Sequence, residues 1–175
     1  MRNKRIEKVI FLDRDGLLIH SIGNGKYVKE KNQVRIIDVN IELFRKLSAI
    51  YDVAFIVVTN QAGVEKGLIS IEDVEAVNLH ISSIMIQNQI RIEKFYVCPH
   101  KQETECRCRK PKPGLLEKAI RDYSLIPSKC LMIGDRETDI LAGNAIGIRS
   151  FLLNYRTTPS ERKVISNQIT SFLEN

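Results

Sequence analysis

The chain has 175 residues, of which 43% are hydrophobic and 27% charged, and its formal net charge is +6. These values are ordinary for a globular protein, and no apolar run approaches the ~20 residues of a membrane span. The apolar segment after the basic residues 1–5 is ended by Asp13, which makes it too short for a secretory signal. We therefore expect a cytoplasmic protein.

The positive charge is scattered, apart from basic stretches at residues 26–31 and 107–112. A basic protein favours polyanionic partners, but basic and aromatic residues are not interleaved here as they are in single-strand binders. We therefore expect a small phosphorylated metabolite as the partner, with no membrane and no nucleic acid. We also expect a monomer, built as one domain over residues 1–175.

Apolar, strand-like runs alternate with helix-like periodic segments, which indicates an α/β fold with a parallel sheet and crossover helices. In chain order, the predicted strands are residues 9–12, 53–58, 94–97, 130–133 and 149–153. The predicted helices are residues 38 or 40 to 50, 70 to about 89, 114–123, 138–145 and 159–173.

Two helix starts carry capping signals. Asp38 or Asn40 is expected to cap the first helix with its side chain. Ser70 with Asp73 three residues later predicts a capping box at the second.

Residues 16–37 contain a turn signal, Gly23-Asn24-Gly25, and only short apolar pairs. We expect an ordered loop or a small hairpin that lies over the ends of the strands. This loop is too short to form a separate cap domain, and so is the connection between the second and third strands. The predicted site is therefore open.

Polar residues follow the predicted strands at their carboxyl ends. Asp13 and Asp15 come directly after the first strand, Thr59 and Asn60 follow the second, and Asp135 follows the fourth. Because the carboxyl ends of parallel strands meet at one edge of a sheet, we expect these side chains to lie close together.

Two carboxylates this close resist joint ionisation without a cation, and Mg²⁺ prefers oxygen ligands. We therefore predict a Mg²⁺-dependent phosphoryl-transfer site. Asp13 supplies the nucleophile, and Asp15 serves as general acid and then as base. Asp135, with Asp13 and a backbone carbonyl, holds the metal. Thr59 donates to a phosphoryl oxygen, and Lys110 provides a fixed cation there.

Asp-Arg-Asp-Gly at 13–16, Thr-Asn at 59–60, Lys110 and Gly-Asp-x-x-x-Asp at 134–139 occur in this order. This set resembles the haloacid dehalogenase-like phosphatase superfamily, over residues 9 to about 153. The resemblance implies a Rossmann-like parallel sheet flanked by helices, without a separate cap domain. It also implies that Asp13 forms an aspartyl phosphate and that Asp15 protonates the leaving alkoxide and then activates water. By the same resemblance, the backbone carbonyl of Asp15 joins Asp13 and Asp135 on Mg²⁺.

The sequence departs from the superfamily pattern at one position. Leu17 stands where many members have threonine. This replacement removes an auxiliary hydrogen bond but no catalytic atom.

A compact set of three thiols and one imidazole lies between the third strand and Lys110, namely Cys98, His100, Cys106 and Cys108. Such residues form closed, tetrahedral Zn²⁺ sites, so we predict a structural zinc loop over residues 98–108. The metal would order a polar loop that has little core of its own. Because Arg109 and Lys110 follow directly, we expect the zinc to fix the loop that aims these cations at the substrate.

The zinc loop also resembles one subgroup, which contains the D-glycero-D-manno-heptose 1,7-bisphosphate phosphatases and the bacterial histidinol-phosphate phosphatases. The five-residue gap from His100 to Cys106 is similar to the histidinol-phosphate enzymes. The runs at 59–67 and 109–114, and the Gly-Lys-Tyr-Val at 25–28, are more similar to the heptose enzymes. We favour removal of the C7 phosphate of the heptose bisphosphate, a step in lipopolysaccharide or S-layer precursor synthesis, over hydrolysis of histidinol phosphate.

A bisphosphate has a second phosphate to bind, and guanidinium groups suit bidentate contact with it. The residues expected to bind substrate are Arg14, Tyr27, Asn60, Gln61, Arg109 and Arg136.

Three rival interpretations come from other classes. A nucleic-acid 3′-phosphatase would share the catalytic set, and an open site accepts larger substrates. A non-catalytic zinc-binding module would need broken catalytic residues, whereas these are present. A receiver-like phospho-acceptor domain is disfavoured by the Asp-x-Asp at 13–15 and by the zinc loop.

Overall fold

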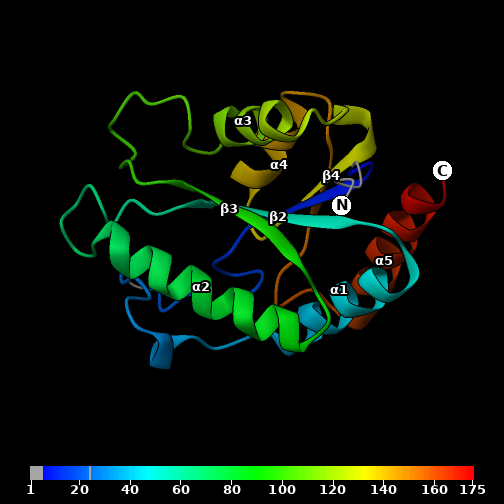
Figure 1. Cartoon of the computed structure of the whole chain (residues 1–175), viewed down its shortest axis with the longest axis horizontal. Helices are drawn as coiled ribbons and strands as arrows, with labels where there is room; N and C mark the ends of the chain where they lie inside the picture. The colour runs from blue at the N-terminus through cyan, green and yellow to red at the C-terminus, as the bar shows by residue number, and fades with distance from the viewer. Residues whose placement is uncertain (1–5, 24) are drawn as a thin grey trace, which may run out of the picture.

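Five parallel strands form one sheet, in the spatial order β3-β2-β1-β4-β5 (Figure 1). The computed structural model describes residues 6–23 and 25–175. The strands are β1 (Val9–Leu12), β2 (Ala54–Asn60), β3 (Ile92–Cys98), β4 (Cys130–Gly134) and β5 (Arg149–Leu152). The strand order reverses at β1, which pairs with β2 on one side and with β4 on the other. Ligands of such sheets bind beyond the carboxyl ends at this reversal.

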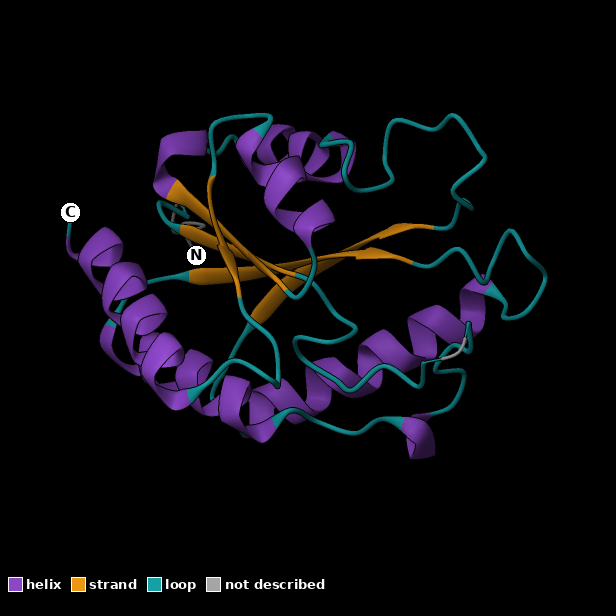
Figure 2. Ribbon diagram, turned by 180° about the vertical axis from the view of Figure 1, so that it is seen from behind, coloured by secondary structure: helices purple, strands orange, loops and turns teal. Residues whose placement is uncertain are grey.

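Helices cover both faces of the sheet (Figure 2). α1 (Asp38–Ile50), α2 (Ile71–Gln87) and α5 (Pro159–Glu174) pack on one face. α3 (Gly114–Tyr123) and α4 (Glu137–Asn144) pack on the other. Two short 3-10 helices, η1 (Lys31–Gln33) and η2 (Pro127–Lys129), lie in the connections. Within the described residues, no helix is both long enough and apolar enough to cross a membrane.

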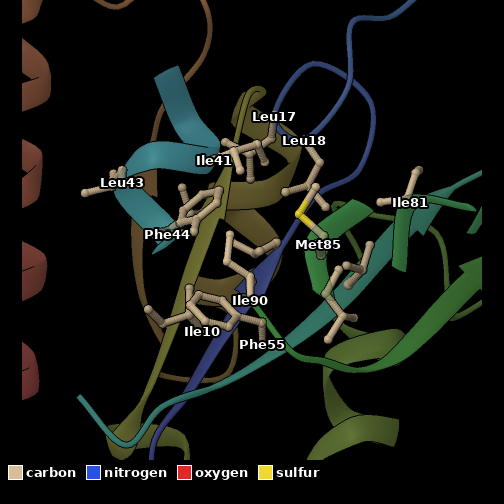
Figure 3. Packing of buried hydrophobic residues seen from close by; sticks show 14 of the residues in the cluster. Ile10, Leu17, Leu18, Ile41, Leu43, Phe44, Phe55, Ile81, Met85 and Ile90 are labelled. Atoms are coloured by element: carbon tan, nitrogen blue, oxygen red, sulfur yellow. The ribbon is translucent and has the colours of Figure 1, made fainter. Parts of the chain in front are cut away.

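The apolar runs of the strands are continuous because the central strands are buried on both faces. In β1, Ile10 belongs to the core under α1, α2 and α5, whereas its neighbour Phe11 belongs to the core under α3 and α4. Figure 3 shows the first of these cores, where the ring centroids of Phe44 and Phe55 lie 5.9 Å apart. This two-sided packing holds the carboxyl ends of β1, β2 and β4 at a fixed spacing.

The predicted order and type of the helices and strands are confirmed. Where the observed ends differ from the predicted ones, they differ by one or two residues. The Ser70–Asp73 capping box is present, because the Asp73 N–H donates to Ser70 Oγ and the Ser70 N–H donates to Asp73 Oδ2. In the predicted loop over 16–37, Ile19 bridges to both Asp15 and Ile36. The turn expected at 23–25 includes Asn24, which lies outside the described residues.

The predicted cap of the first helix is wrong. α1 begins after Ile37, and no side chain caps it there. Asn40 is instead buried, and its Nδ2 donates to the Leu17 carbonyl at 2.7 Å. Its Oδ1 accepts a hydrogen bond from Arg162 of α5. Asn40 therefore ties the C-terminal helix to the loop that follows Asp13 and Asp15.

Replacing Asn40 with alanine leaves the Leu17 carbonyl and the Arg162 guanidinium without these partners. We expect the free energy of unfolding to fall by about 1–3 kcal/mol, since both groups stay at least partly buried. Urea unfolding measures this difference. The control Lys46→Ala, on the exposed side of α1, should lose no more than about 0.5 kcal/mol. An Asn40→Ala protein as stable as this control would contradict the assignment.

Candidate active site

A cavity of about 560 Å³ lies at the carboxyl ends of β1 and β2. The loop over 17–28, the segment 102–112 and the start of α4 also contribute to its wall. Arg14 does not line it. The other residues predicted for catalysis or substrate binding do: Asp13, Asp15, Tyr27, Thr59, Asn60, Gln61, Arg109, Lys110 and Arg136.

Lys110 is the central cation of this site and is almost fully buried. Its Nζ lies 2.7 Å from Asp13 Oδ1 and 2.5 Å from Asp139 Oδ1, and it donates to the Val58 carbonyl at 2.7 Å. Burial raises the pKa of Asp13, although Lys110 opposes that shift. Burial alone would lower the pKa of Lys110. The negative charges of Asp13 and Asp139 outweigh this effect, and the pKa of Lys110 is raised. Lys110 therefore stays charged beside Asp13.

Asn60 holds the backbone of Lys110 rather than acting only at the cavity wall. Its Nδ2 donates to the Lys110 carbonyl, and its Oδ1 accepts from the Lys110 N–H, both at 3.1 Å. This pair of bonds joins the end of β2 to the segment after the cysteine cluster. Asn60 is predicted from the sequence to bind substrate, and its contact with the Lys110 backbone is an additional, unpredicted role.

Asp139 is a second residue whose role the sequence analysis missed. It is fully buried, its Oδ1 meets Lys110 and its Oδ2 accepts from the Arg136 N–H at 3.1 Å. The spacing contained a usable signal, because Asp139 follows Asp135 by four residues, in the first turn of α4, and their carboxylates lie in one cluster.

Asp15 is held by three N–H donors. Arg14 donates from Nε to Oδ2 at 3.0 Å and from Nη2 to Oδ1 at 3.3 Å, and Gln61 Nε2 donates to Oδ2 at 2.7 Å. Gln61 Nε2 also donates to Thr59 Oγ1 at 2.9 Å. The prediction that Arg14 binds substrate is contradicted, because its side chain is fully buried and turned toward Asp15 and Asn78. The Arg14 guanidinium therefore binds Asp15 and does not reach a ligand in the cavity.

Three carboxylates offer oxygen atoms that lie within 4.8 Å of one another, from Asp13, Asp135 and Asp139. This set contains both side chains predicted to hold Mg²⁺. Asp135 Oδ1 is buried and has no hydrogen-bond donor among the described atoms. Burial, with the charges of Asp13 and Asp139, raises the pKa of Asp135 to about 7. Clustered carboxylates with an unpaired oxygen fit a hard divalent cation.

Gly16 permits this cluster. Its φ is +93°, a backbone conformation that residues other than glycine rarely adopt. A Cβ atom added here would lie 2.0 Å from Asp135 Oδ2. The glycine after Asp15 is therefore required by space as well as by backbone conformation.

The cysteine cluster forms as predicted in position, since Cys98, His100, Cys106 and Cys108 bring their ligand atoms within 4.8 Å of one another. The Sγ of Cys98 lies 3.8 Å from that of Cys106 and 3.1 Å from that of Cys108. His100 Nδ1 lies 3.6 Å from Cys98 Sγ and 3.2 Å from Cys108 Sγ. A tetrahedral zinc with the usual bond lengths separates its ligands by roughly 3.5–3.8 Å. The donor types and their clustering fit Zn²⁺, although the contacts of Cys108 with Cys98 and His100 are shorter than this range.

The cluster is docked against the cavity by hydrogen bonds. Glu65, in the connection before α2, accepts from the Lys101 N–H and from Thr104 Oγ1, at 2.5 and 2.8 Å. Arg109 Nη1 donates to the His100 carbonyl at 3.1 Å. Burial raises the pKa of Cys106, but the Arg109 N–H and neighbouring thiols outweigh it and lower this pKa to about 7. A thiol so placed readily becomes the thiolate that binds metals.

Beyond Lys110, the cavity is lined by further cations from separate segments, namely Lys26, Arg109, Lys112 and Arg136. The Arg136 side chain is 69% exposed, and its Nε lies 3.8 Å from Asp135 Oδ2. Tyr27 packs against Gly63, where an added Cβ would lie 2.8 Å from its ring. Positive charge therefore surrounds the carboxylates on the open side of the site.

Comparison with known proteins agrees with this geometry. Residues 107–168 match the family model described as HAD-hydrolase-like. The chain is 35% identical to the D-glycero-beta-D-manno-heptose-1,7-bisphosphate 7-phosphatase of Pasteurella multocida, over 85% of this chain and 82% of that protein. It is 32% identical to the histidine biosynthesis bifunctional protein HisB of Blochmanniella floridana, over 82% of this chain but only 40% of that protein.

A solved structure gives the same result. The D,D-heptose 1,7-bisphosphate phosphatase from B. bronchiseptica, complexed with magnesium and phosphate, matches with a TM-score of 0.77 and 25% identity, over 91% of this chain and 86% of that chain. The predicted fold class and the predicted phosphatase activity are both confirmed. The chain belongs to the haloacid dehalogenase-like phosphatases, in the group that contains the D-glycero-D-manno-heptose-1,7-bisphosphate 7-phosphatases.

Proposed function

We propose that this phosphatase removes the C7 phosphate of D-glycero-D-manno-heptose 1,7-bisphosphate. The observation that carries this choice is the placement of Arg109, Lys112 and Arg136 around the cavity that also contains Asp13 and Lys110. A substrate with two phosphates would meet a nucleophile at one end and further cations at the other. The names of the relatives support the same substrate.

In the proposed reaction, a carboxylate oxygen of Asp13 attacks the phosphorus, and the bond from phosphorus to the sugar oxygen breaks. Asp15 gives its proton to the departing alkoxide. Asp15 then takes a proton from the water that attacks the aspartyl phosphate, which releases inorganic phosphate and restores Asp13. Lys110 and Thr59 bind phosphoryl oxygens throughout.

Magnesium, when held by Asp13, Asp135 and the Asp15 carbonyl, supplies positive charge that offsets the charge of the transferring phosphoryl group. Zinc, when held by the four ligands of the 98–108 loop, keeps Arg109 and Lys110 in place. A single domain, a monomer and a cytoplasmic location belong to the same proposal.

Histidinol phosphate is the second candidate, and the partial similarity to HisB favours it. Its cationic amine would call for a carboxylate that is free to pair with it. Among the described residues that line the cavity, the carboxylates are Asp13, Asp15 and Asp139, and each already has a basic partner. Glu65 is engaged by the 98–108 loop instead. The charges of the cavity therefore favour the bisphosphate.

Phosphate release from heptose 1,7-bisphosphate and from histidinol phosphate, measured side by side with Mg²⁺, tests this choice. We expect kcat/KM to be at least about tenfold higher for the bisphosphate, because an amine meets no free carboxylate. Heptose 7-phosphate, which lacks the second phosphate, should show a higher KM. A higher kcat/KM for histidinol phosphate would overturn the proposed substrate.

Gly16→Ala tests the proposed magnesium ligands. The added Cβ would displace Asp135, so we expect kcat/KM to fall by about 100-fold. Gly147→Ala is the matched control, because its φ is +75° and no described atom lies within 4 Å of the added Cβ. Both variants carry backbone strain of about 1–2 kcal/mol, which thermal unfolding reports. Equal activity in the two variants would show that Asp135 has no part in the reaction.

Cys106→Ser tests the proposed zinc. We expect about one zinc per wild-type chain by metal analysis, and less in the variant. Turnover should fall by about 10- to 100-fold while the sheet stays folded, since the cations after the loop lose their support. Cys130→Ala, outside the cluster, should keep its zinc. Wild-type kinetics in a zinc-free variant would disprove the role given to the metal.

A further inference from the structure

Arg14 is a charged side chain with no exposed surface. A buried guanidinium is costly unless it is paired and hydrogen-bonded, so its partners indicate why it is there. Two of its nitrogens donate to the two oxygens of Asp15, at 3.0 and 3.3 Å. The third, Nη1, donates to Asn78 Oδ1 at 2.9 Å. Each nitrogen of the Arg14 side chain therefore donates a hydrogen bond, and together they join the Asp15 carboxylate to the Asn78 amide.

Asn78 occupies an unexpected place in α2. It lies on the buried face of the helix, beside Val74, Val77 and Ile81, and is itself buried. Asparagine is a poor helix former, and a buried amide among apolar side chains requires a partner. Arg14, which is 64 residues away in the sequence, is that partner. Packing alone would favour an aliphatic residue here.

The two oxygens of Asp15 are held unequally. Oδ2 accepts two N–H donors, Arg14 Nε at 3.0 Å and Gln61 Nε2 at 2.7 Å. Oδ1 accepts Arg14 Nη2 at 3.3 Å. Two short bonds occupy both lone pairs of Oδ2, so a proton is accommodated best on Oδ1. The carboxylate is therefore oriented as well as anchored.

We infer that Asn78 is a positioning residue which, through Arg14, holds Asp15 so that Oδ1 is the atom that carries the proton to the leaving group. This inference rests on the proposed role of Asp15 as general acid and base. In that step the bond from phosphorus to the leaving oxygen breaks, the electron pair stays on the oxygen, and the proton on Oδ1 moves to it. In the second step, Oδ1 takes a proton from the attacking water.

A specific kinetic signature follows, because leaving groups differ in their need for this proton. The sugar alkoxide is a poor leaving group and requires it. p-Nitrophenolate leaves readily without it. Mispositioning of Asp15 should therefore slow phosphorylation of the enzyme by an alkyl phosphate but not by p-nitrophenyl phosphate. With the latter, only the later water-dependent step should be slow, so a burst of p-nitrophenolate should appear.

The test compares Asn78→Ala with Val77→Ala, a buried neighbour on α2 that has no contact with Arg14 among the described hydrogen bonds. For Asn78→Ala we expect kcat on heptose 1,7-bisphosphate to fall at least about tenfold with little change in KM, and the burst rate with p-nitrophenyl phosphate to change less than about threefold. Val77→Ala should affect both substrates alike. Asn78→Asp, which keeps an acceptor oxygen for Arg14, should recover most of the loss.

Asp15→Asn separates failure of this inference from failure of the proposed function. If Asp15→Asn shows the leaving-group signature and Asn78→Ala does not, Asn78 has no positioning role. If Asp15→Asn slows phosphorylation of the enzyme by both substrates equally, Asp15 is not the general acid, and the proposed mechanism itself is wrong. Should wild-type enzyme hydrolyse only histidinol phosphate, that alkyl phosphate replaces the bisphosphate in the comparison. Asn78→Leu, which keeps the number and branching of the side-chain heavy atoms, provides a second variant if Asn78→Ala is unstable.

Discussion

The site depends on one buried ammonium group. Lys110 Nζ has almost no access to water, and a charge in that position persists only when other charges surround it. It lies 2.7 Å from Asp13 and 2.5 Å from Asp139. This cation therefore links the carboxyl end of β1 to the start of α4. Removal of Lys110 would leave two buried carboxylates without their cation.

The rest of the fold places this cation. Asn60, at the end of β2, forms two hydrogen bonds with the Lys110 backbone, and the cysteine cluster ends two residues before Lys110. Asp15 is oriented by a separate buried charge, Arg14. The two carboxylates therefore have different environments, one beside an ammonium and the other within a fork of N–H donors. Such different surroundings suit separate roles for two neighbouring acids.

The sequence was sufficient for features that depend on local pattern. The strand over residues 9–12 and the helix over 114–123 have the predicted bounds, because buried strands read as continuous apolar runs and Pro113 precedes the helix. The residues that converge at the cavity were predictable, since parallel strands present their carboxyl ends at one edge. The cysteine cluster was predictable from spacing alone.

Partner choice among polar side chains was not predictable in the same way. Asn40 looked like a helix cap, and Arg14 looked like a phosphate ligand, yet both are buried and bound to segments distant in sequence. Nothing local distinguishes a capping asparagine from one that bridges α1 and α5. The buried Asn78 on α2 is a local anomaly, an amide among aliphatic neighbours, but its role depends on the position of Arg14.

The assignment of Asp13 as the group that receives the phosphoryl is the claim on which the proposed reaction depends. Acid-quench mass spectrometry of Asp15→Asn, mixed with p-nitrophenyl phosphate and Mg²⁺, tests it most directly. This variant lacks the carboxylate that activates water, so the intermediate should accumulate. We predict a phosphoryl group on the peptide that contains Asp13, absent from Asp13→Asn. Phosphorylation of another residue, or p-nitrophenolate release with no phosphorylated protein, would contradict the proposed mechanism.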